Sequence, residues 1–420
     1  MNLKTELTNI AKKALDASRE LLSVSSEAKN KVLLDLAEAL IVEKDAILKA
    51  NKIDIAHAEK AKLSRAFIDR LTLNEKRIQE MADSLRQMVS LSDPVGEEIK
   101  VWDRPNGLKI HKVRAPIGVI AIIYESRPNV TSDCAGLCLK SGNAVILRGG
   151  SESLESNLAI YKIIRKVLKR NNFSENAVNL IAIKDRKAVD VLLKLTDYID
   201  LVIPRGGESL IRRVVGTSHI PVIKHYKGIC HIYVDSKADL NMAQRVCFNA
   251  KVQRPGTCNA METMLVNKEV AGRFLPVMIK ALQDAGVQIR GCALTKQIAK
   301  NFKIKRASDK NYHTEYLDLI LSVKVVKDLN EAVGHINKYG TKHSDSIITE
   351  NQKNAAEFLK RVDSACVYVN ASTRFTDGYQ FGMGAEIGIS TDKLHARGPM
   401  ALEELTTYKY MVFGNGQIRE

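Results

Sequence analysis

The sequence predicts an α/β fold that contains two doubly wound units. Val119–Tyr124 is a continuous apolar run, which is typical of a parallel strand buried on both faces of its sheet. From residue 118 onward, short apolar segments alternate with amphipathic ones, and this rhythm restarts after Asp235. Because alternating strands and helices form right-handed crossovers, we expect one parallel sheet on each side of the restart, with helices on both faces.

Residues 5–90 are expected to be helical. Leucines recur at helical spacing on one face, at Leu33, Leu36 and Leu40. Thr72-Leu-Asn-Glu75 predicts a capping box that opens a helix. The apolar stripe of this helix consists of Ile78, Met81, Leu85 and Met88.

The next segment, 97–117, changes character and is expected to form a hairpin. The turn residues Arg104-Pro-Asn-Gly107 lie between two extended stretches, and an Asn-Gly pair favours a tight hairpin turn. A further strand is expected near the end of the chain, at 408–413.

The remaining elements follow the alternation. In the first unit we expect further strands at 144–147, 178–183, 201–203, 221–223 and 231–234, and helices at about 131–140 and 153–170. In the second unit we expect strands at 264–266, 317–326, 346–349 and 367–370, and helices near 240–250, 269–285, 330–338 and 351–362.

Composition narrows the class of protein. The 420 residues are 45% apolar and 27% charged, which is typical of a globular protein, and the length suggests two or three domains. The chain shows neither a secretory signal nor an apolar run of about 18 residues, so we expect a cytoplasmic protein without a membrane partner. The net charge of +16 suits either an anionic small molecule or nucleic acid. With only 5% aromatic residues and scattered basic ones, the small molecule is favoured.

Cys258 is the leading candidate for a nucleophile. It follows the turn residues Pro255 and Gly256, and the nearby Arg254 would favour its thiolate. The alternative is a buried structural cysteine. The seven cysteines include no C-x-x-C pair, so we expect free thiols and no metal. The cysteines expected to serve in packing are Cys134, Cys138, Cys230, Cys247 and Cys366.

Two glycine turns follow predicted strands and precede predicted helices. They are Leu147-Arg-Gly-Gly-Ser-Glu152 and Ile203-Pro-Arg-Gly-Gly-Glu208. Each places backbone N–H groups and an arginine at a helix start, which suits a phosphate, although a simple tight turn would look the same.

Two histidines, His225 and His231, flank Gly228 and are either acid–base groups or packing residues. The donors in Asn370–Arg374 and His395–Gly398 suit anions or a charged surface.

Long motifs carry a resemblance to a known family. They are YESRPNVTSD at 124–133, KSGNAVILRGG at 140–150, CHIYVD at 230–235, QRPGTCNAMET at 253–263 and FGMGAEIGISTDKLHARGP at 381–399. With these motifs the chain resembles the aldehyde dehydrogenase superfamily, and more narrowly it is similar to the gamma-glutamyl phosphate reductase family.

The resemblance implies an aldehyde dehydrogenase-like fold with three parts. Residues 1–235 would bind NADPH, and 236–364 would form the catalytic domain that carries Cys258. Residues 365–420 would return to the cofactor domain. An arm made of the hairpin 97–117 and the strand 408–413 would join subunits into a homo-oligomer.

The resemblance also implies roles for single residues. Arg148 stands where a cation meets the adenosine ribose and would bind the 2′-phosphate of NADPH. The other cofactor-binding residues would be Gly149, Gly150, Gly206, Gly207 and Glu315, of which Glu315 would hold the nicotinamide ribose. Asn129 is the nearest candidate for the side chain that stabilises the oxyanion. The candidates for holding phosphate and carboxylate groups are Arg127, Arg254 and Arg374.

One departure from the superfamily pattern favours a particular reaction. Hydrolytic aldehyde dehydrogenases carry a glutamate base where this chain has Lys224-His-Tyr-Lys-Gly228, which contains no carboxylate. This absence favours reduction of an acyl phosphate. The implied reaction is NADPH-dependent reduction of L-glutamyl 5-phosphate to L-glutamate 5-semialdehyde through a Cys258 thioester, in proline biosynthesis. The glutamate kinase of the same pathway is a candidate partner. The rival hypotheses are a hydrolytic aldehyde dehydrogenase and a basic nucleic-acid-binding protein.

Overall fold

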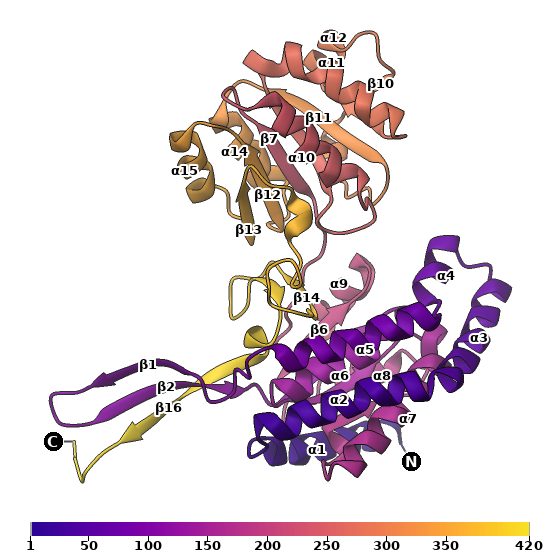
Figure 1. Ribbon diagram of the computed structural model, residues 1–420, viewed down its shortest axis with the longest axis vertical. Helices are drawn as coiled ribbons and strands as arrows, with labels where there is room; N and C mark the ends of the chain where they lie inside the picture. Colours follow the sequence, from indigo (N-terminus) through magenta and orange to yellow (C-terminus); the bar gives the residue numbers. More distant parts are fainter. Residues whose placement is uncertain (1, 420) are drawn as a thin grey trace. The chain divides into compact units, whose positions relative to one another are not determined.

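The computed structural model describes residues 2–419, which form two compact units. The first unit contains the chain up to Lys224, Gly382–Gly388 and the segment from Met400 onward. The second contains His225–Phe381 and Ile389–Pro399. Both are built from parallel strands and helices, so the predicted α/β class is confirmed (Figure 1).

A four-stranded parallel sheet forms the centre of the first unit, in the order β5-β4-β3-β6. Its strands are β3 (Val119–Tyr124), β4 (Ala144–Arg148), β5 (Val178–Leu180) and β6 (Leu201–Arg205). Every residue of β3 is buried, as its apolar run predicts. The helices that alternate with these strands are α6 (Asn129–Lys140), α7 (Leu154–Arg170), α8 (Lys187–Leu192) and α9 (Glu208–Thr217).

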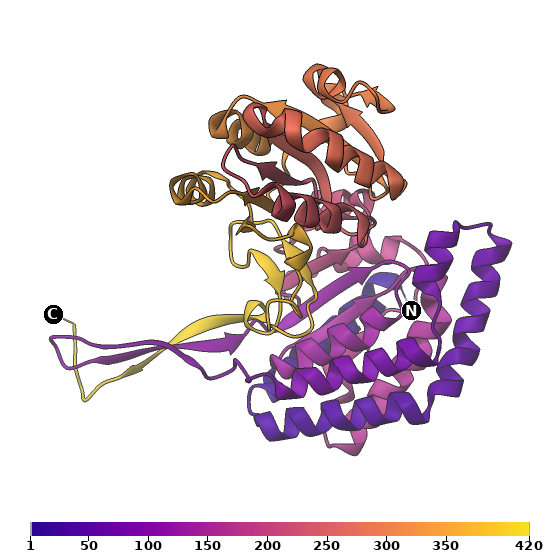
Figure 2. The same ribbon diagram turned by 45° about the horizontal axis from the view of Figure 1, so that its top comes forward.

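Five helices precede this sheet. They are α1 (Leu3–Leu21), α2 (Ser26–Val42), α3 (Lys44–Lys60), α4 (Arg65–Leu71) and α5 (Glu75–Ser90). Helix α2 packs between α5 and α7, and α5 also packs on α6 (Figure 2). The leucine face of α2 and the apolar stripe of α5 are buried as predicted. Nowhere in residues 2–419 does a helix combine the length and apolarity needed to cross a bilayer.

The predicted capping box at Thr72 is wrong. The N-cap of α5 is Asn74, whose side chain accepts a hydrogen bond from the backbone N–H of Arg77 at 2.8 Å. Thr72 instead belongs to the end of α4, where its hydroxyl donates to the carbonyl of Ile68 at 2.7 Å. Asn and Thr both cap helices well, and the closeness of α4 decides between them.

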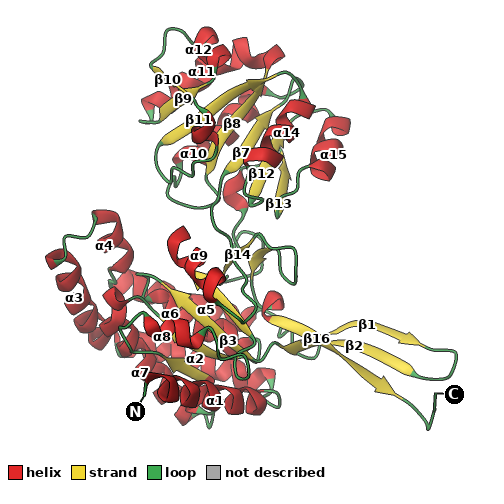
Figure 3. Ribbon diagram, turned by 180° about the vertical axis from the view of Figure 1, so that it is seen from behind, coloured by secondary structure: helices red, strands yellow, loops and turns green. Residues whose placement is uncertain are grey.

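The predicted hairpin and tail strand form one antiparallel sheet. It consists of β1 (Glu98–Asp103), β2 (Lys109–Pro116) and β16 (Thr406–Phe413), in that order. These three strands extend away from the helices of the first unit (Figure 3). Gly107 closes the turn between β1 and β2 with a positive φ of 85°, and its N–H donates to the carbonyl of Arg104.

The second unit contains a seven-stranded sheet in which every pairing is parallel, in the order β10-β9-β11-β8-β7-β12-β13. Its strands are β7 (Cys230–Val234), β8 (Met261–Asn267), β9 (Gln288–Gly291), β10 (Ile304–Arg306), β11 (Ile320–Val326), β12 (Ser344–Ile348) and β13 (Cys366–Val369). Its helices are α10 (Leu240–Val252), α11 (Lys268–Asp284), α12 (Ala293–Ile298), α13 (Asp309–Tyr312), α14 (Leu329–Tyr339) and α15 (Gln352–Arg361).

Alternate residues of the central strands enter two different cores, which shows that helices cover both faces of this sheet. Ile232 and Val234 of β7 pack with α10 and α11, whereas Tyr233 packs with α14 and α15. This alternation follows from the period of two in a strand.

The unit boundaries differ from the sequence-based ones. The division falls after Lys224 and not at residue 235, because β7 pairs with β8 and β12 in the second sheet. The boundary at 364 is also displaced, because β13 completes that sheet and the unit continues to Phe381. The expected strand at 221–223 is reduced to one bridge between Val202 and Val222. A short pair, β14 (Gly388–Ser390) and β15 (Gly398–Met400), occupies the tail.

A buried ion pair joins two elements of the second unit. Lys251 Nζ of α10 lies 2.9 Å from Glu262 Oε2 of β8, and both side chains are 0% exposed. The other oxygen, Glu262 Oε1, accepts the backbone N–H of Leu317 at 3.0 Å. Burial raises the pKa of Glu262, and the Lys251 ammonium opposes that rise. The pair therefore fixes both ends of the loop 253–260 and anchors the segment before β11.

Removing one partner of this pair should destabilise the protein strongly. We expect Lys251→Met to lower the free energy of unfolding by about 3–5 kcal/mol, because it leaves a buried carboxylate without its cation. The double variant Lys251→Met/Glu262→Gln should recover most of that loss, since Gln keeps an acceptor for Leu317. Urea denaturation measures both values. A single variant as stable as wild type would contradict this account.

Candidate active site

Cys258 lies in the loop between α10 and β8, and its side chain is partly exposed. The Thr257 hydroxyl donates to the carbonyl of Arg254 at 2.9 Å and closes the turn before it. By contrast, the cysteines predicted to serve in packing are all buried, which confirms that prediction. The remaining partly exposed thiol is Cys292.

Gly228 permits a very close approach to the backbone of Cys258. A Cβ atom at residue 228 would lie 1.8 Å from the Cys258 carbonyl oxygen and 2.7 Å from its Cα. The N–H of Gly228 donates to Glu315 Oε1 at 2.7 Å, and the Cys230 thiol donates to the Cys258 carbonyl at 3.2 Å. Only glycine fits here, and through Gly228 the structure brings Glu315 to the Cys258 loop.

Asn259 and Arg374 hold the other side of this loop. The side-chain amide of Asn259 donates to the backbone carbonyl of Thr376 at 2.9 Å, and the backbone carbonyl of Asn259 accepts a hydrogen bond from the Thr373 hydroxyl at 2.7 Å. Arg374 Nε donates to Gln253 Oε1 at 2.9 Å, and Arg374 Nη1 donates to Asn259 Oδ1.

Two predicted anion-binding arginines, Arg254 and Arg374, thus lie in one region with Cys258. Burial of Arg374 and repulsion from Arg254 lower the pKa of Arg374, while the charge of Cys258 acts in the opposite direction. Two cations near a thiol stabilise its thiolate form. This arrangement is compatible with the predicted nucleophilic cysteine and anionic substrate, and both roles stay predictions.

Two histidines accompany Cys258. One donor atom each from His225, Cys258 and His343 lie within 4.8 Å of one another. His225 Nδ1 donates to the carbonyl of Ile389 at 2.7 Å. Burial, with a contribution from His225, lowers the pKa of His343 to about 3, so its imidazole is neutral. His231 is fully buried beside Asp345 at 3.0 Å and serves in packing.

The sequence analysis missed His343 and expected no metal. Residues 225, 258 and 343 are far apart in the sequence, so no spacing motif announces their convergence. A histidine directly before a buried strand was the available signal, and it is a weak one.

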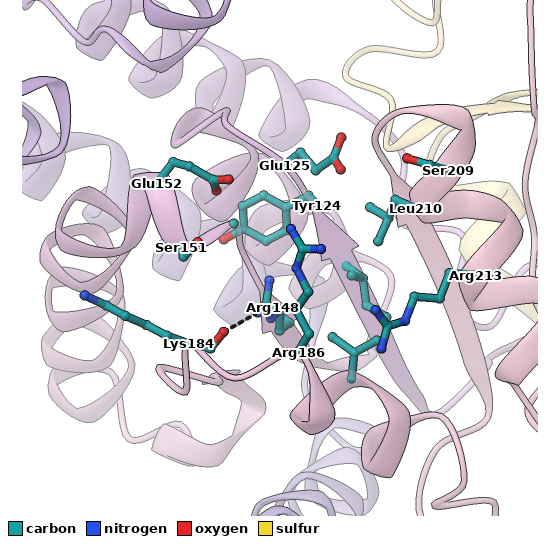
Figure 4. A pocket seen from close by; sticks show the side chains of 13 residues that line it. Tyr124, Glu125, Arg148, Ser151, Glu152, Lys184, Arg186, Ser209, Leu210 and Arg213 are labelled. Atoms are coloured by element: carbon teal, nitrogen blue, oxygen red, sulfur yellow. Dashed lines mark hydrogen bonds between the residues drawn. The ribbon is translucent and has the colours of Figure 1, made fainter. Parts of the chain in front are cut away.

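The first unit contains a cavity of about 340 Å³ at the carboxyl ends of its strands (Figure 4). It is lined by Ile123, Tyr124, Glu125, Arg148, Gly150, Ser151, Glu152, Lys184, Arg186, Val189, Ser209, Leu210 and Arg213. The prediction named Arg148 and Gly150 but missed the three cations Lys184, Arg186 and Arg213. These cations lie on loops and helices that no phosphate motif marks.

Arg148 is largely committed to the protein itself. Its guanidinium donates to the carbonyls of Gly149 at 3.0 Å and Lys184 at 3.3 Å, and the residue is only 9% exposed. Figure 4 shows Arg186 beside it in the cavity, and their mutual repulsion contributes to a lowered pKa of Arg148, of which burial is the main cause. Arg148 thus lines the cavity with two of its N–H groups bonded to backbone carbonyls, while its Nε has no hydrogen-bond partner.

The turn at Gly206 and Gly207 already has an internal anion. The N–H of Gly207, the N-cap of α9, donates to Glu125 Oε2 at 2.8 Å. A Cβ at Gly206 would also lie 2.4 Å from this oxygen. Glu125 thus occupies the helix start at which the sequence analysis expects a cofactor phosphate, and that role stays a prediction.

Asn129 and Arg127 belong to the first unit, at the start of α6. The amide of Asn129 donates to Asp133 Oδ2 at 2.9 Å, within the same helix. Arg127 is exposed, and its carbonyl accepts the N–H of Val130. Their roles toward oxyanion and substrate also stay predictions.

Comparisons with known proteins show the family of the chain. The model of the aldehyde dehydrogenase family matches residues 3–292. This chain belongs to that family. The gamma-glutamyl phosphate reductase of Thermodesulfovibrio yellowstonii is 57% identical over 420 residues, which cover 100% of both chains.

Solved structures place the fold in the same family. A crystal structure of gamma-glutamyl phosphate reductase from Thermotoga maritima matches with a TM-score of 0.97 at 50% identity, covering 99% of this chain and 100% of that one. An acetylating aldehyde dehydrogenase from Geobacillus thermoglucosidasius matches with a TM-score of 0.71 at 14% identity, covering 100% and 98%. The chain is therefore an enzyme of an oxidoreductase family, and the predicted aldehyde dehydrogenase-like fold is confirmed.

Filling the space at Gly228 should disturb Cys258. We expect Gly228→Ala to destabilise the protein by about 1–3 kcal/mol and to slow alkylation of Cys258 by iodoacetamide, because the methyl group displaces the Cys258 backbone. Urea denaturation and peptide mapping of the alkylated thiol measure the two effects.

Gly256→Ala, in the loop that carries Cys258, is the matched control. A Cβ there meets nothing closer than the Leu317 carbonyl at 3.7 Å, an ordinary contact. Equal stability and equal Cys258 reactivity in both variants would show that the close approach at Gly228 has no effect.

Proposed function

We propose that this protein reduces L-glutamyl 5-phosphate to L-glutamate 5-semialdehyde, with NADPH as reductant and release of phosphate, in proline biosynthesis. The observation that carries the proposal is the partly exposed Cys258, held against Gly228 with Arg254 and Arg374 in the same region. Relatives named gamma-glutamyl phosphate reductase, at 57% identity over the full chain, support the choice of substrate.

The chemistry begins with attack of the Cys258 thiolate on the acyl carbon. A C–S bond forms, the C–O bond to phosphate breaks, and phosphate leaves with the bonding electron pair. The backbone N–H of Cys258 would stabilise the oxyanion that forms in this attack. Arg254 and Arg374 supply positive charge for the phosphate and the substrate carboxylate. Addition of a hydride to the thioester carbon would form a C–H bond and give a hemithioacetal, whose C–S bond then breaks to release the aldehyde and restore the thiolate.

The carboxylates near the site are engaged elsewhere, which supports transfer to phosphate over hydrolysis. Glu315 accepts the N–H of Gly228, and Glu262 is paired with Lys251. The segment from Lys224 to Gly228 contributes no carboxylate. A thioester that must react with water needs a general base, whereas phosphate is itself an anionic nucleophile.

The cavity of the first unit is suited to a phosphorylated dinucleotide. NADPH, when bound, supplies a hydride. Within residues 2–419, the side chains of Lys184 and Arg186 form no hydrogen bond or ion pair, and Arg213 pairs with Asp190 at 2.9 Å. We therefore assign the 2′-phosphate to Arg186, assisted by Lys184, in place of Arg148. Glu152 is suited to a ribose hydroxyl. A solved structure with the same fold, an engineered glycolyl-CoA reductase at 14% identity, holds NADP⁺.

The arm supports assembly into a homo-oligomer. Its outer strands β1 and β16 each leave one edge unpaired within residues 2–419. Exposed apolar side chains gather on this sheet, at Ile99, Val101, Tyr408, Tyr410, Met411, Val412 and Phe413. Unpaired edges with apolar side chains favour pairing with another chain, and we propose a second copy as the occupant. The glutamate kinase stays a predicted partner.

A phosphate-dependence assay tests the reaction. With the semialdehyde and NADP⁺, we expect a rapid single turnover of NADPH formation, followed by turnover only when phosphate is present. Without a positioned base, hydrolysis of the thioester should be slower by about 10²–10⁴-fold. Stopped-flow absorbance follows both phases.

Cys258→Ser should abolish the rapid phase, and Cys292→Ser, which alters the other partly exposed thiol, should retain it. Steady NADPH formation without phosphate would return the protein to the hydrolytic branch, with His225→Ala as the next variant. A Cys258→Ser variant that keeps more than about a tenth of the rate would exclude this nucleophile.

Cofactor preference tests the cavity. We expect Arg186→Ala to weaken NADPH binding about ten- to a hundredfold and NADH binding little, because a charge-assisted hydrogen bond contributes roughly 1.5–3 kcal/mol. Arg148→Ala should weaken both cofactors alike, since it removes contacts to the Gly149 and Lys184 carbonyls. Fluorescence titration measures the four affinities. A loss selective for NADPH in Arg148→Ala alone would return the phosphate contact to Arg148.

A further inference from the structure

Three side chains with metal-binding chemistry converge in the second unit. His225 precedes β7, Cys258 lies in the loop before β8, and His343 directly precedes β12. One donor atom from each lies within 4.8 Å of the other two. No other group of three or more such residues is found within the described part of the chain.

His343 supplies an independent observation. Its side chain is 0% exposed, and its Nε2 has no hydrogen-bond partner. The other ring nitrogen, Nδ1, lies 2.9 Å from the Ser344 hydroxyl, so the ring is already oriented. Leaving a buried polar nitrogen unsatisfied costs about 1–3 kcal/mol, and such an atom in a native structure calls for an explanation.

The donor set suits a particular class of cation. One thiolate and two imidazoles are typical zinc ligands, and three protein ligands leave a fourth position open. Zn–S and Zn–N bonds of about 2.3 and 2.0–2.1 Å place tetrahedral ligand atoms roughly 3.5 Å apart. Small side-chain rotations would therefore close the present cluster around a cation.

The surrounding contacts resemble those of known metal sites. Metal-binding histidines usually engage their second ring nitrogen with a carbonyl, carboxylate or other polar group, which fixes the ring. Here His225 Nδ1 donates to the Ile389 carbonyl at 2.7 Å, and His343 Nδ1 lies beside the Ser344 hydroxyl.

We propose that His225, Cys258 and His343 form a binding site for a thiophilic divalent cation, Zn²⁺ being the chemical fit, and that its binding blocks the nucleophile. On binding, the Cys258 sulfur forms a bond to the cation and its proton passes to solvent, with no change in oxidation state. A sulfur bound in this way cannot attack an acyl carbon. Zn²⁺ would thus act as a reversible inhibitor that competes with the acyl substrate.

The cation site does not depend on the proposed reaction, because binding is measured directly. Co²⁺ is titrated into the metal-free full chain in buffer without thiols or chelators. A sulfur-to-cobalt charge-transfer band should appear, and Zn²⁺ should displace it. Zn²⁺ should also protect Cys258 from iodoacetamide, and EDTA should restore the reaction. A chain that binds Co²⁺ but reduces no acyl phosphate would overturn the proposed function alone.

Variants decide whether this cluster is the site. His343→Asn keeps a polar atom for Ser344 and removes Nε2. This variant should weaken Zn²⁺ binding by at least about 10–100-fold, because removing a residue that only supports a metal ligand already costs that much affinity. Cys258→Ser should lose the charge-transfer band, and Cys292→Ser should keep it.

Two results would overturn the proposal. One is a charge-transfer band that persists in Cys258→Ser, and the other is wild-type affinity in His343→Asn. If circular dichroism shows that His343→Asn does not fold, His225→Gln is tested in its place, because the His225 ring is partly exposed. The same loss of Zn²⁺ affinity is expected.

Discussion

The second unit depends on the buried pair of Lys251 and Glu262, which lie at the two ends of the loop that carries Cys258. Separating two buried charges costs several kcal/mol, so the end of α10 and the start of β8 cannot move apart. Because Glu262 also accepts the N–H of Leu317, the same group anchors the segment that contains Glu315. The loop 253–260, which carries Cys258, is thus held at its ends by the Lys251–Glu262 ion pair and is contacted at Cys258 by Gly228.

Positive charge is concentrated where the proposed chemistry needs it. In the second unit, Arg254 and Arg374 lie near enough to each other to lower the pKa of Arg374. In the first unit, Arg186 stands beside the largely buried Arg148. Like charges that face one another repel, and a bound phosphate relieves this repulsion. Within the net charge of +16, these two pairs of arginines are therefore the groups suited to binding phosphate.

The environment of Cys258 suits its sulfur to both proposed uses, attack on an acyl carbon and coordination of a cation. Nearby cations favour the thiolate, which is the form both for attack on an acyl carbon and for coordination of a metal ion. The Nε2 atom of His343 has no hydrogen-bond partner, and a water molecule could supply one only if the site had room for it. The proposed reactivity and the proposed binding of thiophilic cations would thus arise from the same arrangement.

The local features of this protein follow from its sequence alone. Neighbouring residues are enough to produce the apolar run of β3, the turn before Cys258 and the hairpin at Gly107. The long motifs shared with the family predicted the fold. The strand order and the convergence of the site residues depend on contacts between distant segments. The tertiary structure placed β7 and β13 in the second sheet, because strand order is set by pairing between distant segments. It committed Arg148 to two carbonyls, filled the start of α9 with Glu125 and brought His343 to Cys258. Each outcome depends on side chains meeting across long stretches of chain, and no local pattern encodes such a meeting.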